Sequence, residues 1–415
     1  MNLQNHPYYN YYEQDGKKFQ SKAMALYASY LPPKKDRGDI VWRLHNFESK
    51  LEAINLCEEP KESLSTLYIQ RAQQLRNDYE YLILNYSGGP DSHNILETFL
   101  LNNIFLDEIL IYSYFDEPTI DRLYHTDLST FSLFPEFYEA EKSALIVAKH
   151  LVEKYSPHTK ITFVNNMYEI HKKFWETITE EDFIQSVKGN ASILLSHRHM
   201  QRVRDPNFVT SWKDLKQRKK TAHIWGIEKP RPNYDDIGIF VSFLDQTILS
   251  RIDLQYLLTP EDIPNNHELF YVHPDFINLF LKQCHVLMNS FPKEFFRQIS
   301  SRKYEDTLAS ALYPIKTKIM YSGLKIPDLL NKYEEFPILK EMSKTGIIPG
   351  FVDMGEPLLL GFYLKDKDSL ASKNYDRFVS FLQNTMFSHF GRKKLMYTLT
   401  SGMPSKKHYL KYFER

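Results

Sequence analysis

The sequence is poor in glycine and cysteine and has no net charge. It contains 14 glycines and two cysteines among 415 residues, and its 52 basic residues equal its 52 acidic ones. A charge balance of this kind provides no overall field that draws a protein to nucleic acid or to an anionic membrane. Cys57 and Cys284 stand far apart, which excludes a CxxC motif and a disulfide framework.

Long apolar runs are also absent. No stretch reaches the ~18 apolar residues that mark a membrane-spanning helix, and the first residues do not resemble a secretory signal. We therefore expect a cytoplasmic protein that does not contact membrane. The content of 42% hydrophobic and 25% charged residues is that of an ordinary globular protein, so extensive disorder is not expected.

The length predicts two or three domains. We expect residues 1–75 to form an irregular N-terminal extension with short helices, and residues 76–250 to form an α/β domain. Residues 251–415 carry little strand signal, so a mostly helical C-terminal region is predicted there.

Within the central part, strand-like and helix-like patterns alternate. The predicted strands are Leu82–Tyr86, Asp107–Ser113, Lys160–Asn166, Thr221–Ile227 and Ile237–Asp245. Predicted helices are Ser63–Asn77, a segment beginning near Asp91, Glu139–Tyr155 and His273–Phe291. This alternation predicts right-handed crossovers and a mainly parallel sheet flanked by helices, which binds ligands at the carboxyl ends of its strands.

Two of the few glycines, Gly88 and Gly89, are adjacent in "YLILNYSGGPDSHNILETFLLNN" (residues 81–103). A strand, a glycine pair and a helix in this order form an anion cradle, because main-chain amides can approach a ligand where no Cβ intervenes. Pro90 suits the first position of a helix. A helix that begins near Asp91 turns its positive end toward the loop, which favours phosphate.

Polar side chains surround the glycine pair. Ser87 and Ser92 offer hydroxyl donors, whereas Asp91 is out of place beside an anion unless Mg²⁺ lies between them. The loop is neither a Walker A motif nor a G-x-G-x-x-G motif. "SGGPDS" instead resembles the S-G-G-x-D-S pattern of the PP-loop, or N-type, ATP pyrophosphatases, within the adenine nucleotide alpha-hydrolase-like superfamily.

A second stretch extends this resemblance. "IWGIEKPRPNYDDIG" (residues 224–238) is similar to a later strand and loop of the asparagine-synthetase-like branch, as seen in uncharacterised bacteriophage proteins. The resemblance covers about residues 71–246, with weaker similarity over residues 268–286. It implies a Rossmann-like (HUP-type) parallel sheet in a PP-loop ATP-binding domain over residues 76–250, in the cytoplasm or, for a virus-encoded protein, in the host cytoplasm.

The resemblance also implies site residues. Those matching the pyrophosphate-binding motif are Ser87, Gly88, Gly89, Asp91 and Ser92. Asp91 would also bind Mg²⁺ and, with Lys229 as a cationic clamp on the phosphates, act in catalysis. Arg231 is a weaker candidate for phosphate binding, and both cations are alternatively solvated loop charges. The end of the second strand, Ile111, Tyr112 and Ser113, would lie near adenine, largely through main-chain contacts.

The implied reaction cleaves ATP between the α and β phosphates and attaches AMP to an oxygen of the acceptor, after which a nucleophile displaces AMP. Met1 is followed by Asn2, so the cysteine nucleophile of a glutaminase domain is missing. The isolated cysteines disfavour sulfur chemistry. We therefore expect an adenylating enzyme that forms an amide or amine at a carboxyl or carbonyl oxygen, with nitrogen supplied from outside.

Two alternatives stay open. One is a non-catalytic nucleotide-binding or assembly protein that retains the loop. The other is a PP-loop enzyme that modifies nucleic-acid bases through the basic region 197–231, which carries ten Lys and Arg against three acidic residues. A solvated helix face is the simpler interpretation of that region. The neutral overall charge favours a small-molecule acceptor.

Further polar residues have simpler interpretations. His197 and His199 have no third ligand nearby in the sequence, so zinc is not expected. Asp235 and Asp245 lie near strand ends, where capping of loops is favoured over a second Mg²⁺ site.

Overall fold

The structure is a computed structural model of the whole chain. It describes residues 7–19, 21–30, 39–113, 144–164, 176–180, 220–226, 230, 232–243, 245, 265–290, 369–385, 403 and 405–413.

A five-stranded, all-parallel sheet forms the centre of the described fold. Its strands, in spatial order, are β10 (Asn265–Leu269), β7 (Thr221–Trp225), β4 (Tyr81–Asn85), β5 (Glu108–Tyr112) and β6 (Lys160–Val164). β4 is central, β5 and β6 follow on one side, and β7 and β10 lie on the other. The predicted parallel sheet is thus confirmed, in a strand order compatible with a Rossmann-like fold.

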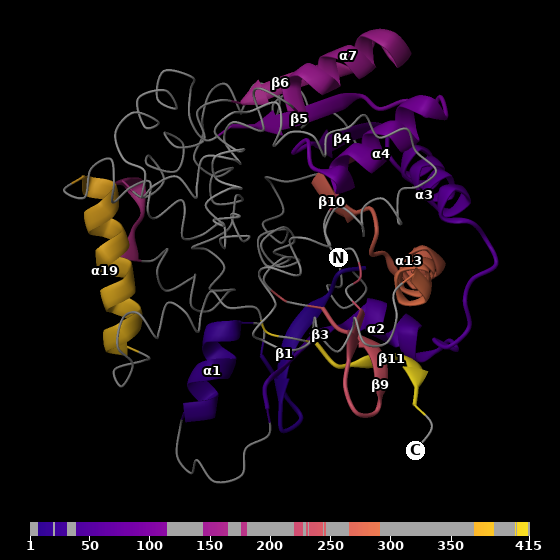
Figure 1. Cartoon of the computed structure of the whole chain (residues 1–415). Helices are drawn as coiled ribbons and strands as arrows, with labels where there is room; N and C mark the ends of the chain where they lie inside the picture. The colour runs from indigo at the N-terminus through magenta and orange to yellow at the C-terminus, as the bar shows by residue number, and fades with distance from the viewer. Residues whose placement is uncertain are drawn as a thin grey trace, which may run out of the picture.

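Three helices cover one face of this sheet (Figure 1). They are α3 (Leu64–Asp78), α4 (Pro90–Leu101) and α7 (Leu145–Tyr155). α3 begins where the Ser63 side chain accepts from the Thr66 amide at 3.1 Å, which caps the helix. Leu82 and Leu84 of β4 point into the main core, whereas Ile83 faces the opposite side.

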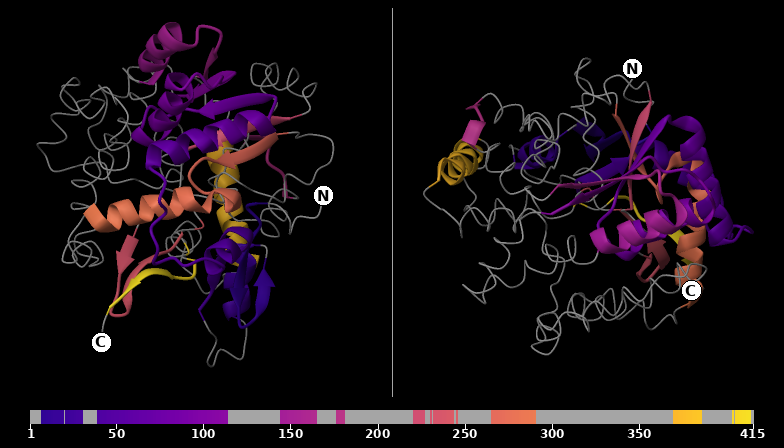
Figure 2. Two further views of the ribbon diagram at one scale, coloured as in Figure 1. Left: turned by 90° about the vertical axis from the view of Figure 1, so that its right-hand side faces the viewer. Right: turned by 90° about the horizontal axis from the view of Figure 1, so that it is seen from above.

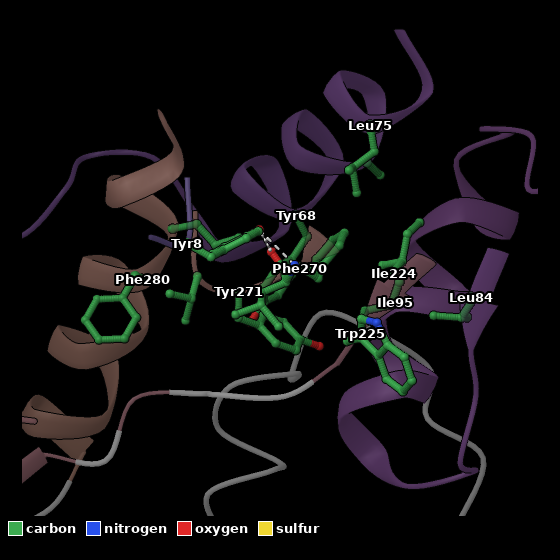
Figure 3. Packing of buried hydrophobic residues seen from close by; sticks show 14 of the residues in the cluster. Tyr8, Tyr68, Leu75, Leu84, Ile95, Ile224, Trp225, Phe270, Tyr271 and Phe280 are labelled. Carbon is green, nitrogen blue, oxygen red and sulfur yellow. Dashed lines mark hydrogen bonds between the residues drawn. The ribbon is translucent and has the colours of Figure 1, made fainter. Parts of the chain in front are cut away.

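The main core unites the sheet and these helices with α13 (Ile277–Ser290), which follows the short helix η6 (Pro274–Phe276). Figure 3 shows Leu84, Ile95 and Ile224 from β4, α4 and β7 near the aromatic residues that follow β10. Figure 2 shows α13 crossing between the parallel sheet and two smaller sheets. Since α13 packs against α3 and against α2 (His45–Glu52), these layers form one continuous core.

The two smaller sheets are antiparallel. One consists of β2 (Lys17–Phe19), β1 (Asn10–Gln14) and β3 (Val41–Leu44), and the other of β11 (His408–Tyr412), β9 (Gly238–Val241) and β8 (Pro232–Tyr234). The remaining helices are α1 (Lys22–Tyr30), α2 (His45–Glu52) and α19 (Leu370–Thr385). The strand predicted at Ile237–Asp245 therefore exists in part, but its expected place in the parallel sheet is wrong.

Asp245 joins segments that are distant in sequence. Its buried carboxylate accepts from the Tyr12 hydroxyl at 2.7 Å and from the Met403 amide at 2.6 Å, and it pairs with Lys22 Nζ at 3.2 Å. Asp235 caps its own turn, as predicted, by accepting from the Gly238 amide at 3.1 Å. The carboxylates near these strand ends therefore connect and shape the smaller sheets.

The region expected to be an irregular N-terminal extension contains β1, β2 and β3, so the expectation of irregular structure is wrong there. The central sheet also extends beyond residue 250, the expected end of the α/β domain, because β10 adds a strand to it. No helix in the described parts of the chain is both long and apolar enough to span a bilayer.

Candidate functional site

The Ser-Gly-Gly loop lies at the carboxyl end of β4. β4 runs beside β7, and Asn85 is paired with Trp225 at the last position of both strands. After β4 the chain continues to β5, which lies on one side of the β4–β7 pair. After β7 it continues to β10, which lies on the opposite side of this pair. Ligands of open parallel sheets bind where the strand order reverses in this way, outside the carboxyl ends. The loop therefore occupies the position that the topology favours for a ligand.

Hydrogen bonds of two serines shape the loop. Ser92 Oγ accepts from the Ser87 amide at 3.2 Å and donates to the Gly89 carbonyl oxygen at 3.1 Å. Ser87 Oγ in turn accepts from the Gly89 amide at 3.3 Å. Ser92 is buried and Ser87 is exposed, so only Ser87 has its side chain open to solvent. Ser92 thus stabilises the turn from within.

α4 begins at Pro90, close to the predicted start. Gly89 is its N-cap and has no side chain with which to accept hydrogen bonds from the amides of the first turn. The His93 amide makes the first intrahelical bond, to the Gly89 carbonyl oxygen at 3.0 Å. The positive end of α4 consequently faces the loop without a capping side chain at the N-cap position.

Gly88 has two reasons to lack a side chain. Its φ of +77° lies in the left-handed region, which a residue with a Cβ rarely adopts. A Cβ at this position would also lie 2.7 Å from the Cβ of Ala144, directly before α7. The glycine therefore allows α7 to pack closely against the loop.

Replacement of Gly88 by alanine is expected to lower the free energy of unfolding by about 2–4 kcal/mol, since left-handed strain and overpacking add. Gly16→Ala is the matched control. Gly16 has a φ of +74°, but a Cβ added there would meet no heavy atom within 4 Å, so strain alone should give about 1–2 kcal/mol. Urea unfolding of both variants measures the difference. Equal losses would contradict the close packing of Ala144 on Gly88.

Gly226 brings the segment after β7 to the start of α4. A Cβ at this position would lie 2.9 Å from the Ser92 amide nitrogen and 3.0 Å from the carbonyl carbon of Asp91. Both atoms belong to the main chain of α4, so neither can rotate away. Two chain segments thus meet at the first turn of α4: the Ser-Gly-Gly loop and the residues following β7.

Asp91 lies in this first turn and is half-buried. Its main-chain oxygen accepts from the Tyr271 hydroxyl at 2.7 Å. Its carboxylate lies close enough to Tyr68 to act on that phenol: burial raises the pKa of Tyr68, and the charge of Asp91 raises it further. The main chain of Asp91 is therefore held by the segment after β10.

The expected adenine-contacting residues lie at the carboxyl end of β5, next to β4. Ile111 and Ser113 are buried and Tyr112 is half-buried. The Ser113 amide donates to the Val164 carbonyl oxygen at 2.7 Å, so this amide is already used in a hydrogen bond to the end of β6. A main-chain contact with a base at this edge would have to use other groups.

Several predicted residues lie outside the described residues. They include Lys229, Arg231, His197, His199 and the basic region 197–231 apart from residues 220–226 and 230. Among the side chains that the structure describes, no group of three or more His, Cys, Asp or Glu is arranged to hold a metal ion.

Comparison of the chain with protein families, curated proteins and solved structures found no match.

Three structural contributors were not singled out from the sequence. Gly226 stands directly after a strand, a position where an isolated glycine signals close approach of another main chain. Ala144 and Tyr271 gave no local signal, because each contacts the loop or α4 across a long separation in sequence.

Proposed function

We propose that the protein is an ATP-dependent adenylating enzyme of the PP-loop (N-type) ATP pyrophosphatase type, with a HUP-type Rossmann-like domain. It adenylates an oxygen of a carboxyl or carbonyl group with release of pyrophosphate, and nitrogen then bonds to the carbon that carries this oxygen, giving an amide or amine while AMP leaves with the oxygen. One observation carries the proposal: "SGGPDS" forms the turn between the central parallel strand and α4, where the strand order reverses.

The loop is suited to polyphosphate. The first-turn amides and the dipole of α4 stabilise negative charge, and Ser87 adds an exposed hydroxyl. When charge develops on the α-phosphate and on the leaving pyrophosphate, donors fixed in advance stabilise it without reorganisation. The internal hydrogen bonds of Ser92 and the packing of Gly88 on Ala144 supply that rigidity.

Asp91 fits a magnesium site of the kind formed with nucleotides. Mg²⁺ is usually held by one or two carboxylates together with phosphate oxygens and water. Asp91 offers one half-buried carboxylate beside the loop, where it would otherwise repel phosphate. The cation would neutralise charge on the phosphates, and Asp91 would hold it there.

The chain after β7 supplies the candidate cations. Lys229 follows Gly226 by three residues, a stretch that spans at most ~11 Å, and Gly226 contacts the first turn of α4. We assign Lys229 to the phosphates as a catalytic clamp and Arg231 as an additional phosphate contact. A lysine acts here as a point charge, which suits the spread charge of a polyphosphate.

The thiols do not favour sulfur transfer. Cys284 lies in α13 and is buried, and burial raises the pKa of its thiol, which keeps the reactive thiolate scarce. Cys57 is exposed, but it is a single thiol without a second cysteine near it in the sequence. We therefore retain ammonia or an amine from an external donor, and a small-molecule acceptor.

The test is incubation of the purified protein with Mg²⁺, ATP labelled at the α-phosphate, ammonium and pooled small carboxylic acids. Formation of AMP and pyrophosphate is expected, and Asp91→Asn is expected to reduce the rate by about 10²-fold or more because a charge-stabilising ligand is lost. Ser87→Ala should weaken ATP binding with a smaller effect on rate.

Asp275→Asn is the matched control, because Asp275 also lies in the first turn of a helical segment, η6, but away from the loop and with 72% of its side chain exposed. It should keep the wild-type rate. Binding of ATP without any AMP would instead support the non-catalytic alternative. Formation of ADP, or the absence of any effect of Asp91→Asn, would refute the proposed reaction.

A further inference from the structure

A buried tyrosine that follows β10 forms hydrogen bonds with the first turn of α4. The Tyr271 hydroxyl donates to the Asp91 main-chain oxygen at 2.7 Å and accepts from Asn94 Nδ2 at 3.0 Å. Tyr271 is fully buried, and Figure 3 shows its hydroxyl pointing toward the side of the cluster where Ile95 of α4 lies. One side chain thus bridges two positions, three residues apart, at the start of α4.

This bridge acts on the residue proposed to bind the cation. A carbonyl oxygen has two lone pairs, so the Asp91 oxygen can receive the tyrosine in addition to an intrahelical donor. Asn94 is itself buried, which holds the hydroxyl in one orientation between its two partners. The Tyr68 and Tyr271 rings meet edge to face, with centroids 6.0 Å apart. The main chain of Asp91 is therefore anchored where its carboxylate leaves the helix.

We propose that Tyr271 is a positioning residue for the divalent cation that accompanies the nucleotide. This inference rests on the proposed function and adds to it a residue 180 positions from Asp91 in the chain. Mg²⁺ demands near-ideal octahedral geometry, so motion of the first turn of α4 would displace the Asp91 carboxylate and weaken its contact with the cation. Phosphate bound by several main-chain amides tolerates the same motion better. Tyr271 accordingly supports cation binding more than phosphate binding.

The experiment uses Tyr271→Phe, which removes only the hydroxyl. ATP is titrated into the full chain by calorimetry, once with Mg²⁺ and once with EDTA. In the wild type, Mg²⁺ should tighten binding of ATP. In Tyr271→Phe this gain should fall about tenfold, as for partners that orient metal ligands, while the affinity in EDTA stays unchanged. Equal loss in both buffers, or no loss in either, would overturn the positioning role.

Tyr12→Phe is the matched control. It also removes a buried tyrosine hydroxyl, which donates to Asp245 Oδ2 at 2.7 Å, but it lies in β1. Its unfolding temperature should fall by an amount similar to that of Tyr271→Phe, whereas its Mg²⁺ dependence should match the wild type. A changed Mg²⁺ dependence in Tyr12→Phe would show that loss of stability alone accounts for the effect.

Asn94→Leu tests the same bridge if Tyr271→Phe does not fold. It removes the amide that orients the hydroxyl, so a smaller loss of the Mg²⁺ gain is expected, and an unchanged gain contradicts the inference. The two proposals fail differently. A wild type that binds no ATP in either buffer refutes the nucleotide site, whereas normal Mg²⁺-dependent binding by both wild type and Tyr271→Phe refutes only the role of Tyr271.

Discussion

Replacement of Arg71 by leucine is expected to lower the free energy of unfolding by about 3–5 kcal/mol, because it leaves a buried carboxylate without its counter-charge. Arg71 is fully buried in α3, and its Nη2 donates to Glu268 Oε2 at 2.7 Å and to the Leu269 carbonyl oxygen at 3.0 Å. The tyrosines Tyr8 and Tyr79 also donate to Glu268. They remain in the variant but bring no positive charge.

Urea unfolding with linear extrapolation measures this loss. Arg377→Leu is the matched control. Arg377 pairs with Glu180, and their side chains are 61% and 79% exposed, respectively, so this ion pair should contribute less than about 1 kcal/mol. The double variant Arg71→Leu/Glu268→Gln should recover part of the stability, since a neutral amide needs no counter-ion. A loss below that of Arg377→Leu would contradict the buried pair.

Acidification is expected to destabilise the protein through the same cluster. Burial, assisted by the neighbouring positive charge of Arg71, lowers the pKa of His273 to about 4. The usual value in an unfolded chain is about 6.5. Between these two values the unfolded state binds more protons than the folded state, so stability falls as the pH drops from about 6.5 to about 4. The loss over this window amounts to about 3 kcal/mol, and none of it occurs above the window.

His273→Phe removes this titration and should flatten the pH dependence of the urea midpoint between pH 6.5 and 4. His158→Phe provides the control, because it replaces an exposed side chain outside this cluster and should keep the wild-type slope. Glu268 extends the effect to lower pH: despite its burial, Arg71 and then His273 lower its pKa. An unchanged slope in His273→Phe would contradict a neutral, buried His273.

Four of the five strands of the central sheet were predictable, because these strands and the helices beside them carry local signals. β4 to β7 are short segments rich in aliphatic, β-branched and aromatic residues, and Pro90 and Ser63 mark helix starts. The glycine loop was predictable for the same reason, since strand, glycine pair and helix are contiguous in the chain. Its contact with Gly226 depends on the pairing of β4 with β7, which the sequence shows only indirectly.

β10 could not be predicted from its own residues. Its sequence, Asn-Asn-His-Glu-Leu, has no apolar run, and the buried Glu268 is paired with Arg71, 197 positions earlier in the chain. The hairpin of β1 and β2, in contrast, does carry a local signal: Asp15 and Gly16 both have positive φ, as Asp-Gly does in a tight hairpin turn. β10 is thus formed through its tertiary partners, whereas the hairpin of β1 and β2 is specified by the residues of its turn.

The pairing of β11 with β9 has a consequence for biosynthesis. About 170 residues separate the two strands, which at 5–20 residues per second corresponds to roughly 10–35 s on the ribosome. His408 likewise meets Glu48 only after 360 further residues have been made. During that interval the nascent β8–β9 hairpin exposes an unpaired edge, a target for chaperones and for intermolecular strand pairing.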